Sequence, residues 1–238
     1  FLTGNYTVQD ALRLGKLVYE LDLPLGDAYE NVAPIPDGFM NRAATPYIKN
    51  ADYLAVRFTF DIDTKKCSVS ETDLLYDALL SGYNSRFFIE MSEKRGLFYD
   101  TSGALERYRN IGTLHFTYEL RGDNLLPALE VTVDILNSMK NERLSDAECM
   151  RAGYTDNAYM LLDDNRELNF TFAYDTKITG APYASIDDRR AAYAAVSAER
   201  LMELASQIFT RKNLTLTMKG NKKRIDAEAV EKILARLG

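Results

Sequence analysis

The sequence has one histidine in 238 residues, no tryptophan and only two cysteines. Zinc hydrolases need several nitrogen, thiolate or carboxylate ligands in one shell, so a two-histidine helical motif cannot be built from His115 alone. A serine or cysteine nucleophile activated by histidine would have to use this same residue, and nothing around it marks a partner. His115 stands between Leu114 and Phe116 in a strand-like run. This setting favours a structural role for it and leaves substrate contact as the alternative.

Other signatures of common function classes are also missing. None of the 13 glycines forms G-x-G-x-x-G or G-x-x-x-x-G-K, so no phosphate-cradling loop is expected. The chain carries 29 basic and 35 acidic residues without a long run of one sign, which argues against a nucleic-acid or anionic-membrane surface. No apolar run reaches the roughly 18 residues of a membrane span. We therefore expect neither nucleic acid nor a membrane as a partner.

The two cysteines, Cys67 and Cys149, lie far apart in the sequence and have no Cys or His cluster near them. Free thiols of this kind are typical of a reducing compartment, so a cytoplasmic location is expected. Adjacent acids such as Asp163 and Asp164 are usually solvated surface pairs. They leave open, as one alternative, an independent enzyme that uses acidic residues.

Alternation of apolar and polar residues predicts the strands. From 52 to 63, Leu54 and Phe58 belong to an apolar face, while Arg57 and Thr59 belong to the opposite face. This run is expected to be a half-buried strand. Three further strand-like runs follow, the first two of them as a hairpin: 97–107, 111–120 and 213–219.

Serine or threonine placed three residues before an acidic residue marks several helix starts, because the two side chains can cap each other's backbone N–H groups. Such boxes begin at Thr7, Ser68 and Ser145. A helix from about Ser85 is expected to end at Gly96, which is well placed as the glycine after the last turn. The remaining helices are expected at 123–140, 145–173, 186–194, from 196 onward and at 226–237.

Strands joined by a tight turn, together with helices in runs, predict an α+β fold. We expect a mainly antiparallel β-sheet with helices packed on one face. Hydrophobic residues make up 46% of the chain, which is ample for the core of one large domain. Residues 22–50 hold four of the six prolines. Residues 1–50 are therefore expected to form a linker with a leading helix, and residues 51–238 the main domain.

Residues 79–99, LLSGYNSRFFIEMSEKRGLFY, form the most informative stretch. It resembles the signature of the second half of pitrilysin/insulinase-like zinc peptidases, in which a helix, a small turn, S-R-L-F, L-R-E-K-x-G-L-A-Y and a strand follow in order. Residues 85–88 match the first block and residues 91–99 the second. The order of the later elements agrees as well, and the resemblance extends from about residue 53 to the C-terminus.

The resemblance implies a two-half enzyme in which similar α+β domains face each other around a chamber. In that family zinc is held by an H-x-x-E-H motif and a distal Glu on the other half. This chain lacks the motif, so no cofactor is expected in it, and its expected partner is a zinc-bearing catalytic half on the same or a separate polypeptide. In active members an Arg and a Tyr of the second block bind the substrate near the scissile carbonyl. Tyr99 stands at the Tyr position, the Arg position is Ser92, and Arg95 is the candidate substitute.

The expected function is therefore the non-catalytic C-terminal half of a zinc metallopeptidase of this family. Such a half is inactive by itself and contributes to a peptide-binding chamber. Tyr99 and Arg95 are its expected substrate-binding residues, and no catalytic or metal-binding residue is expected in the chain. The alternative is an inactive scaffold or assembly subunit with the same fold, which the departure at Ser92 favours.

Overall fold

The computed structural model describes residues 2, 5–23, 26, 43–44, 52–98, 100–108, 111–149, 174, 176–177, 183 and 186–238. The long helix predicted for 145–173 starts inside this part, at a capping box in which the Ser145 hydroxyl accepts the backbone N–H of Glu148. Its continuation beyond residue 149 falls almost wholly outside the described residues. Tyr99 also lies outside them.

One sheet has the strand order β1-β5-β2-β4-β3. The central strand β2 pairs antiparallel with β4 on one side and with β5 on the other, and β3 pairs antiparallel with β4. The predicted mainly antiparallel sheet is thereby confirmed, while the short strand β1, parallel to β5, was not predicted. The bounds are Ala43–Ala44 for β1, Tyr53–Ile62 for β2, Asp100–Arg107 for β3, Gly112–Arg121 for β4 and Leu214–Lys219 for β5.

Strand β3 begins at Asp100, later than the sequence predicted, because the chain first closes the preceding helix. The backbone N–H of Gly96 donates to the carbonyl of Ser92 at 2.8 Å, and that of Leu97 donates to the carbonyl of Met91 at 2.9 Å. Gly96 has a φ of 59°, the left-handed conformation that glycine adopts at low cost after a helix. The predicted stop at Gly96 is confirmed.

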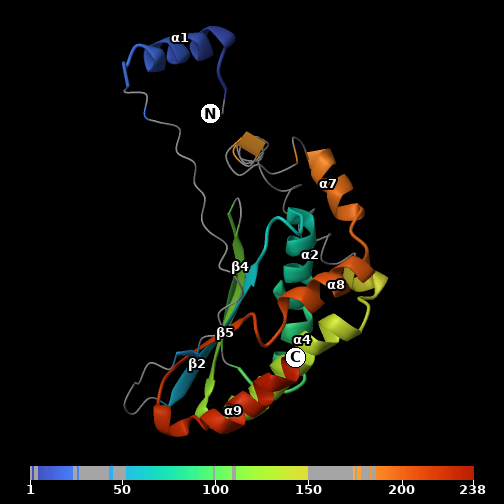
Figure 1. The fold of residues 1–238 in the computed structure, drawn as a ribbon. Helices are drawn as coiled ribbons and strands as arrows, with labels where there is room; N and C mark the ends of the chain where they lie inside the picture. Colours follow the sequence, from blue (N-terminus) through green and yellow to red (C-terminus); the bar gives the residue numbers. More distant parts are fainter. Residues whose placement is uncertain are drawn as a thin grey trace.

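Helices cover one face of the sheet (Figure 1). The covering helices are α2 (Val69–Leu80), α4 (Leu125–Asn141), α8 (Ala198–Ile208) and α9 (Ala227–Leu234). Side chains at their N-terminal ends satisfy free backbone N–H groups: Ser68 caps α2, Ser197 caps α8 and Asp226 caps α9. The other short elements are α3 (Arg86–Phe88), η1 (Ile89–Glu93), η2 (Gly122–Asn124), α7 (Ile186–Ala194), η4 (Lys222–Arg224) and η5 (Ala235–Leu237).

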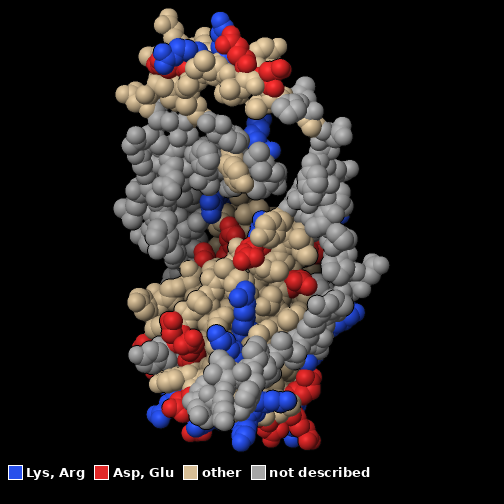
Figure 2. Space-filling model, turned by 90° about the vertical axis from the view of Figure 1, so that its left-hand side faces the viewer, with Lys and Arg blue, Asp and Glu red and all other residues tan. Residues whose placement is uncertain are grey.

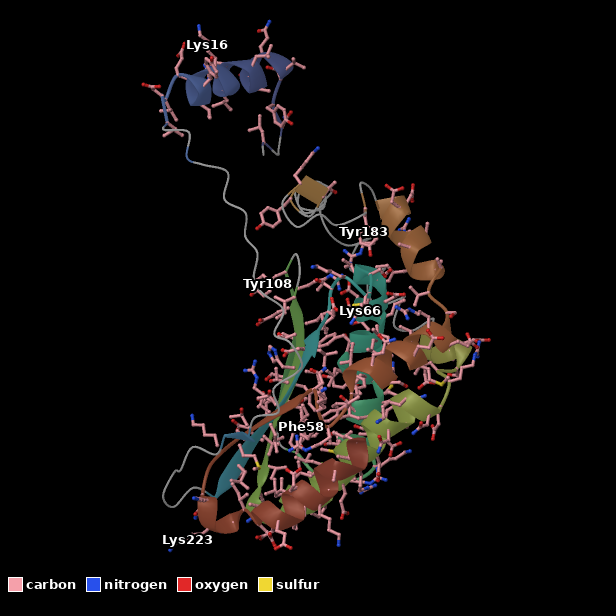
Figure 3. The ribbon with its side chains drawn as sticks, in the orientation of Figure 1. Lys16, Phe58, Lys66, Tyr108, Tyr183 and Lys223 are labelled. Carbon is pink, nitrogen blue, oxygen red and sulfur yellow. The ribbon has the colours of Figure 1, made fainter. Side chains whose placement is uncertain are left out.

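The core lies between the sheet and these helices. On β2, Phe58 is fully buried and stacks on Phe116 of β4, with ring centroids 5.1 Å apart. Figure 3 shows Phe58 in the middle of the sheet, among closely packed side chains. The buried residues of the strands and of the covering helices form one cluster, so these elements share a single core.

Helix α1 (Val8–Tyr19) stands apart from the sheet in Figure 1. It starts at the predicted capping box, in which Thr7 and Asp10 bond each other's backbone N–H groups. None of its residues is buried. Within the described residues, no helix combines the length and the apolar character needed to cross a bilayer.

Candidate functional site

The face of the sheet opposite the helices is open and polar. Along β2, the buried residues alternate with Ala55, Arg57, Thr59 and Asp61, which are partly or fully exposed. The neighbouring strands continue this face with Thr113, His115, Thr117 and Glu119 of β4 and with Thr215, Thr217 and Lys219 of β5. Figure 2 faces this side of the molecule and shows a broad, mostly uncharged surface crossed by a few charged side chains.

The strand register arranges the middle of this face in rows. Arg57 lies between Thr117 of β4 and Thr217 of β5, and Thr59 lies between His115 and Thr215 in the same way. Directly opposite residues in antiparallel strands have Cβ atoms about 5 Å apart. Hydroxyl, imidazole and guanidinium groups are therefore gathered on one patch of the open face.

His115 belongs to this patch and not to the core. Its side chain is partly exposed on the open face of β4. Partial burial and the nearby Arg57 guanidinium lower the pKa of His115, against a smaller opposing effect of Glu106. The imidazole is therefore neutral at pH 7, when it can both donate and accept a hydrogen bond.

The S-R-F-F part of the family-like stretch has a structural explanation. The hydroxyl of Ser85 caps α3 by accepting the backbone N–H of Phe88 at 3.3 Å. The guanidinium of Arg86 donates from Nε to Glu148 Oε1 at 2.6 Å and from Nη1 to Ser138 Oγ at 2.9 Å. Arg86 thus connects the α3 segment to α4 and to the start of the helix at 145, on the helix-covered side of the sheet.

Arg95 lies on this same side. Its Nη1 donates to Glu90 Oε2 at 2.6 Å and to the backbone carbonyl of Glu90 at 2.8 Å. Hydrogen bonds from Lys94 and then from Arg95 lower the pKa of Glu90. Arg95 and Glu90 border a cavity of about 480 Å³, which is also lined by Val131, Asp134, Ile135 and Ser138 of α4. To contact a peptide on the open face, the Arg95 guanidinium would have to leave Glu90.

The neighbours of Tyr99 are described although Tyr99 is not. Ser92 is half-buried, and its carbonyl accepts the N–H of Gly96. Phe98 stacks on the buried Phe87 with ring centroids 5.8 Å apart and packs against the core. Tyr99 lies outside the described residues, so its expected contact with a peptide stays a prediction.

Two residues gained significance only from the structure. Asn213 is buried and ties β5 to β2, because its side chain accepts the backbone N–H of Asp61 and donates to the Asp61 carbonyl. Arg57 lies at the centre of the open face, with Lys219 two residues beyond its partner Thr217 on β5. The alternation along β2 had already placed Arg57 on the side opposite Phe58, but only the pairing with β4 and β5 supplies its neighbours.

The donor groups of the described residues do not fit a zinc ion. In the part of the chain that the structure describes, no three His, Cys, Asp or Glu side chains gather as a metal site would require. The sequence has only one histidine and no H-x-x-E-H motif. Cys67 is buried and Cys149 half-buried, and both are free.

Parts of the chain match a known protein family and several curated proteins. Residues 50–152 match the family model described as the peptidase M16 inactive domain. Among curated proteins, zinc proteases described as uncharacterized from Mycobacterium tuberculosis and Mycobacterium bovis are 33% identical over 76 residues. That match covers 32% of this chain and 17% of each relative.

Solved structures share the fold. A peptidase M16 inactive domain from Pseudomonas fluorescens has a TM-score of 0.79 at 15% identity, covering 92% of this chain and 52% of that chain. A protease from Helicobacter pylori has a TM-score of 0.75 at 16% identity, covering 91% and 54%. The first half of the periplasmic protease PqqL from Escherichia coli has a TM-score of 0.71 at 12% identity, covering 98% and 54%. The chain thus spans about half the length of these structures.

Proposed function

From the match of residues 50–152 to the peptidase M16 inactive domain, we propose that the chain is a non-catalytic half of the pitrilysin/insulinase-like kind and forms one wall of a peptide-binding chamber. The other wall is a zinc-bearing half that supplies the hydrolytic centre. The single observation that carries the proposal is the two-sided sheet: helices cover one face, and the other is open and polar.

The geometry of the open face supports a peptide as the occupant. Exposed side chains of β2, β4 and β5 form a patch of hydroxyl, imidazole and guanidinium groups on that side. An extended chain lying on such a face can place alternate side chains and backbone groups against it. Because the chain spans about half the length of the solved structures that it matches, a second half of similar size is available as the facing wall.

Zinc belongs to the partner half in this proposal, because the residues of this chain do not provide a ligand set. The metal would polarise the scissile carbonyl and activate water there. Tyr99 and Arg95 remain the proposed peptide contacts next to that centre. For Arg95 the proposal requires the guanidinium to exchange its bond to Glu90 for one to the peptide.

A second candidate function is an inactive scaffold or assembly subunit. The observation that favours it is Ser92, which stands where active members of the family have a substrate-binding Arg. If an oxyanion donor of that kind were simply missing, the rate would fall by about 10²- to 10³-fold. The chain would then shape a complex without supporting efficient proteolysis.

The proposed compartment is the cytoplasm. The two free thiols, Cys67 and Cys149, support it, because a reducing compartment keeps such thiols unpaired. Fractionation of cells that carry the tagged native protein tests this, and recovery of the protein from an extracytoplasmic fraction would contradict it.

Expressing the 238-residue chain and the zinc-bearing half separately and together tests the main proposal. We expect the chain alone to contain no stoichiometric zinc by metal analysis and to cleave no member of a quenched-fluorescence peptide library. The two halves together should cleave peptides, and a partner whose H-x-x-E-H glutamate is changed to Gln is the matched control. Zinc and cleavage in the chain alone would contradict the proposal, whereas a stable complex without cleavage would favour the scaffold.

A further inference from the structure

Arg57 is placed at the centre of the open sheet face. It lies on β2, which has a hydrogen-bonded neighbour on each side, and its flanking residues Val56 and Phe58 are fully buried on the opposite face. The Arg57 side chain is therefore held on the open side, and it is exposed. Its direct cross-strand neighbours are Thr117 and Thr217, both of which carry a hydroxyl group.

No carboxylate neutralises Arg57 within the part of the chain that the structure describes. Arg86, Arg200 and Arg211 show the usual arrangement in this protein, since each donates hydrogen bonds to a glutamate. Among the described residues, Arg57 has no such ion pair or hydrogen bond to a carboxylate. Glu119, two residues beyond Thr117 on β4 and opposite Ala55, is the nearest acid by register, and no hydrogen bond or ion pair joins it to Arg57 in the described structure.

Groups around Arg57 can donate further hydrogen bonds. His115 lies diagonally across from Arg57, opposite Thr59, and the field of the Arg57 guanidinium is one of the causes of the lowered pKa of His115. An unpaired guanidinium with hydroxyls on both sides presents donors without matching acceptors. Such a patch is complementary to a planar anion, because a guanidinium can donate two parallel hydrogen bonds to one carboxylate.

We propose that Arg57 binds a carboxylate of a peptide lying on the open sheet face, with the hydroxyls of Thr117 and Thr217 as additional donors. The inference rests on the proposed function, which brings a peptide to this face, and it deepens it by naming a preferred substrate class. The carboxylate comes either from an acidic side chain or from the peptide C-terminus. The overall charge of -6 does not favour long polyanions, so selectivity must come from this local patch.

Binding to the isolated 238-residue chain tests the inference without the zinc-bearing half. Three peptides of matched length and composition serve as probes: one with an internal Glu and an amidated C-terminus, one with Gln and a free C-terminus, and one with Gln and an amidated C-terminus. Amide signals of the isotope-labelled chain are followed by NMR during titration, because this method measures weak affinities. The preference for a carboxylate peptide over the neutral peptide should be about two- to fivefold, as for an exposed ion pair.

Variants identify the guanidinium responsible. Arg57→Gln should remove the preference, and Arg57→Lys should restore part of it, because Lys keeps the charge but loses the paired donors. Arg121→Gln is the matched control, since Arg121 is an exposed arginine on the same face at the end of β4, opposite Tyr53. It should leave the preference unchanged. Dispersed NMR spectra of each variant verify that it is folded.

Several results would overturn the inference. Equal affinity for all three peptides would do so, as would equal losses in Arg57→Gln and Arg121→Gln, which would indicate unspecific charge attraction. Selectivity for the internal Glu assigns the site to an acidic side chain, and selectivity for the free C-terminus assigns it to the terminal carboxylate.

Failure of this inference can be distinguished from failure of the proposed function. If the joined halves cleave peptides but the Arg57 preference is absent, this inference alone fails. If the preference is present without cleavage, only the proteolytic function fails.

Discussion

Replacing Glu148 with Gln should destabilise the chain by about 2 kcal/mol at neutral pH. Glu148 receives two hydrogen bonds from the Arg86 guanidinium, at 2.6 and 3.4 Å, and its side chain is only 21% exposed. Gln keeps the size of the side chain and can still complete the capping box with Ser145. The substitution therefore removes the charge and also the acceptor that faces Arg86 Nε, because the single carbonyl oxygen of Gln is used by Ser145 and its NH2 group can only donate.

The magnitude follows from the pKa of Glu148. Burial by itself would raise this pKa, but hydrogen bonds from Arg86 and Ser145 outweigh burial and lower it from 4.5 to about 2. The difference of about 2.5, which is 4.5 minus 2, corresponds to about 3.4 kcal/mol at 1.36 kcal/mol per pKa unit. Water reaches part of the pair and screens it, so about 2 kcal/mol is the expected loss.

The pH dependence has a definite sign. A carboxyl whose pKa is lowered by folding stabilises the protein at pH values above its unfolded pKa, and this stabilisation is lost as the pH falls toward the folded value. The contribution of Glu148 is thus complete at pH 7 and decreases from about pH 4.5 toward pH 2. Urea unfolding followed by circular dichroism at pH 7 and pH 3.5 should show a smaller difference between wild type and Glu148→Gln at the lower pH.

The matched control is Asp146→Asn, two residues before Glu148. Asp146 pairs with Arg143 at 3.3 Å but is 90% exposed, so its loss should cost less than about 0.5 kcal/mol. Equal destabilisation by the two substitutions, or a Glu148→Gln effect that is the same at both pH values, would refute the assigned role of the Arg86 contact.

The other stability predictions concern the core and two glycines, and urea unfolding measures them all. Phe58→Ala should cost about 3–5 kcal/mol because the ring is fully buried and stacked on Phe116; a loss below about 1 kcal/mol would contradict this packing. Gly96→Ala should cost about 1 kcal/mol, since φ is 59° but an added Cβ meets no atom within 4 Å. Gly220→Ala should cost more than Gly96→Ala, because its Cβ would lie 2.3 Å from Leu54 Cδ2; the reverse order would be inconsistent with the geometry.

Local patterns were sufficient to predict most elements. The alternation around Phe58 placed β2 and its two faces, since successive strand residues point to opposite sides whatever their neighbours are. The capping boxes at Ser68 and Ser145 and the stop at Gly96 involve residues close in sequence, and all three are present. Strand β1 was missed because two alanines carry no periodicity.

The motif around residues 79–99 was sufficient to predict the similarity to the peptidase M16 inactive domain, because a family signature depends on residue identity and spacing. The tertiary structure alone decided which groups meet. Arg86 and Glu148 are 62 residues apart in sequence, and Arg95 is paired with Glu90 beside α4. Arg57 lies between threonines of two strands that begin 55 or more residues later in the sequence. Core packing sets the strand register that brings them together. Alternation assigns a side chain to one face of a strand, but only the packing of the helices determines which face is covered and which remains open to a partner.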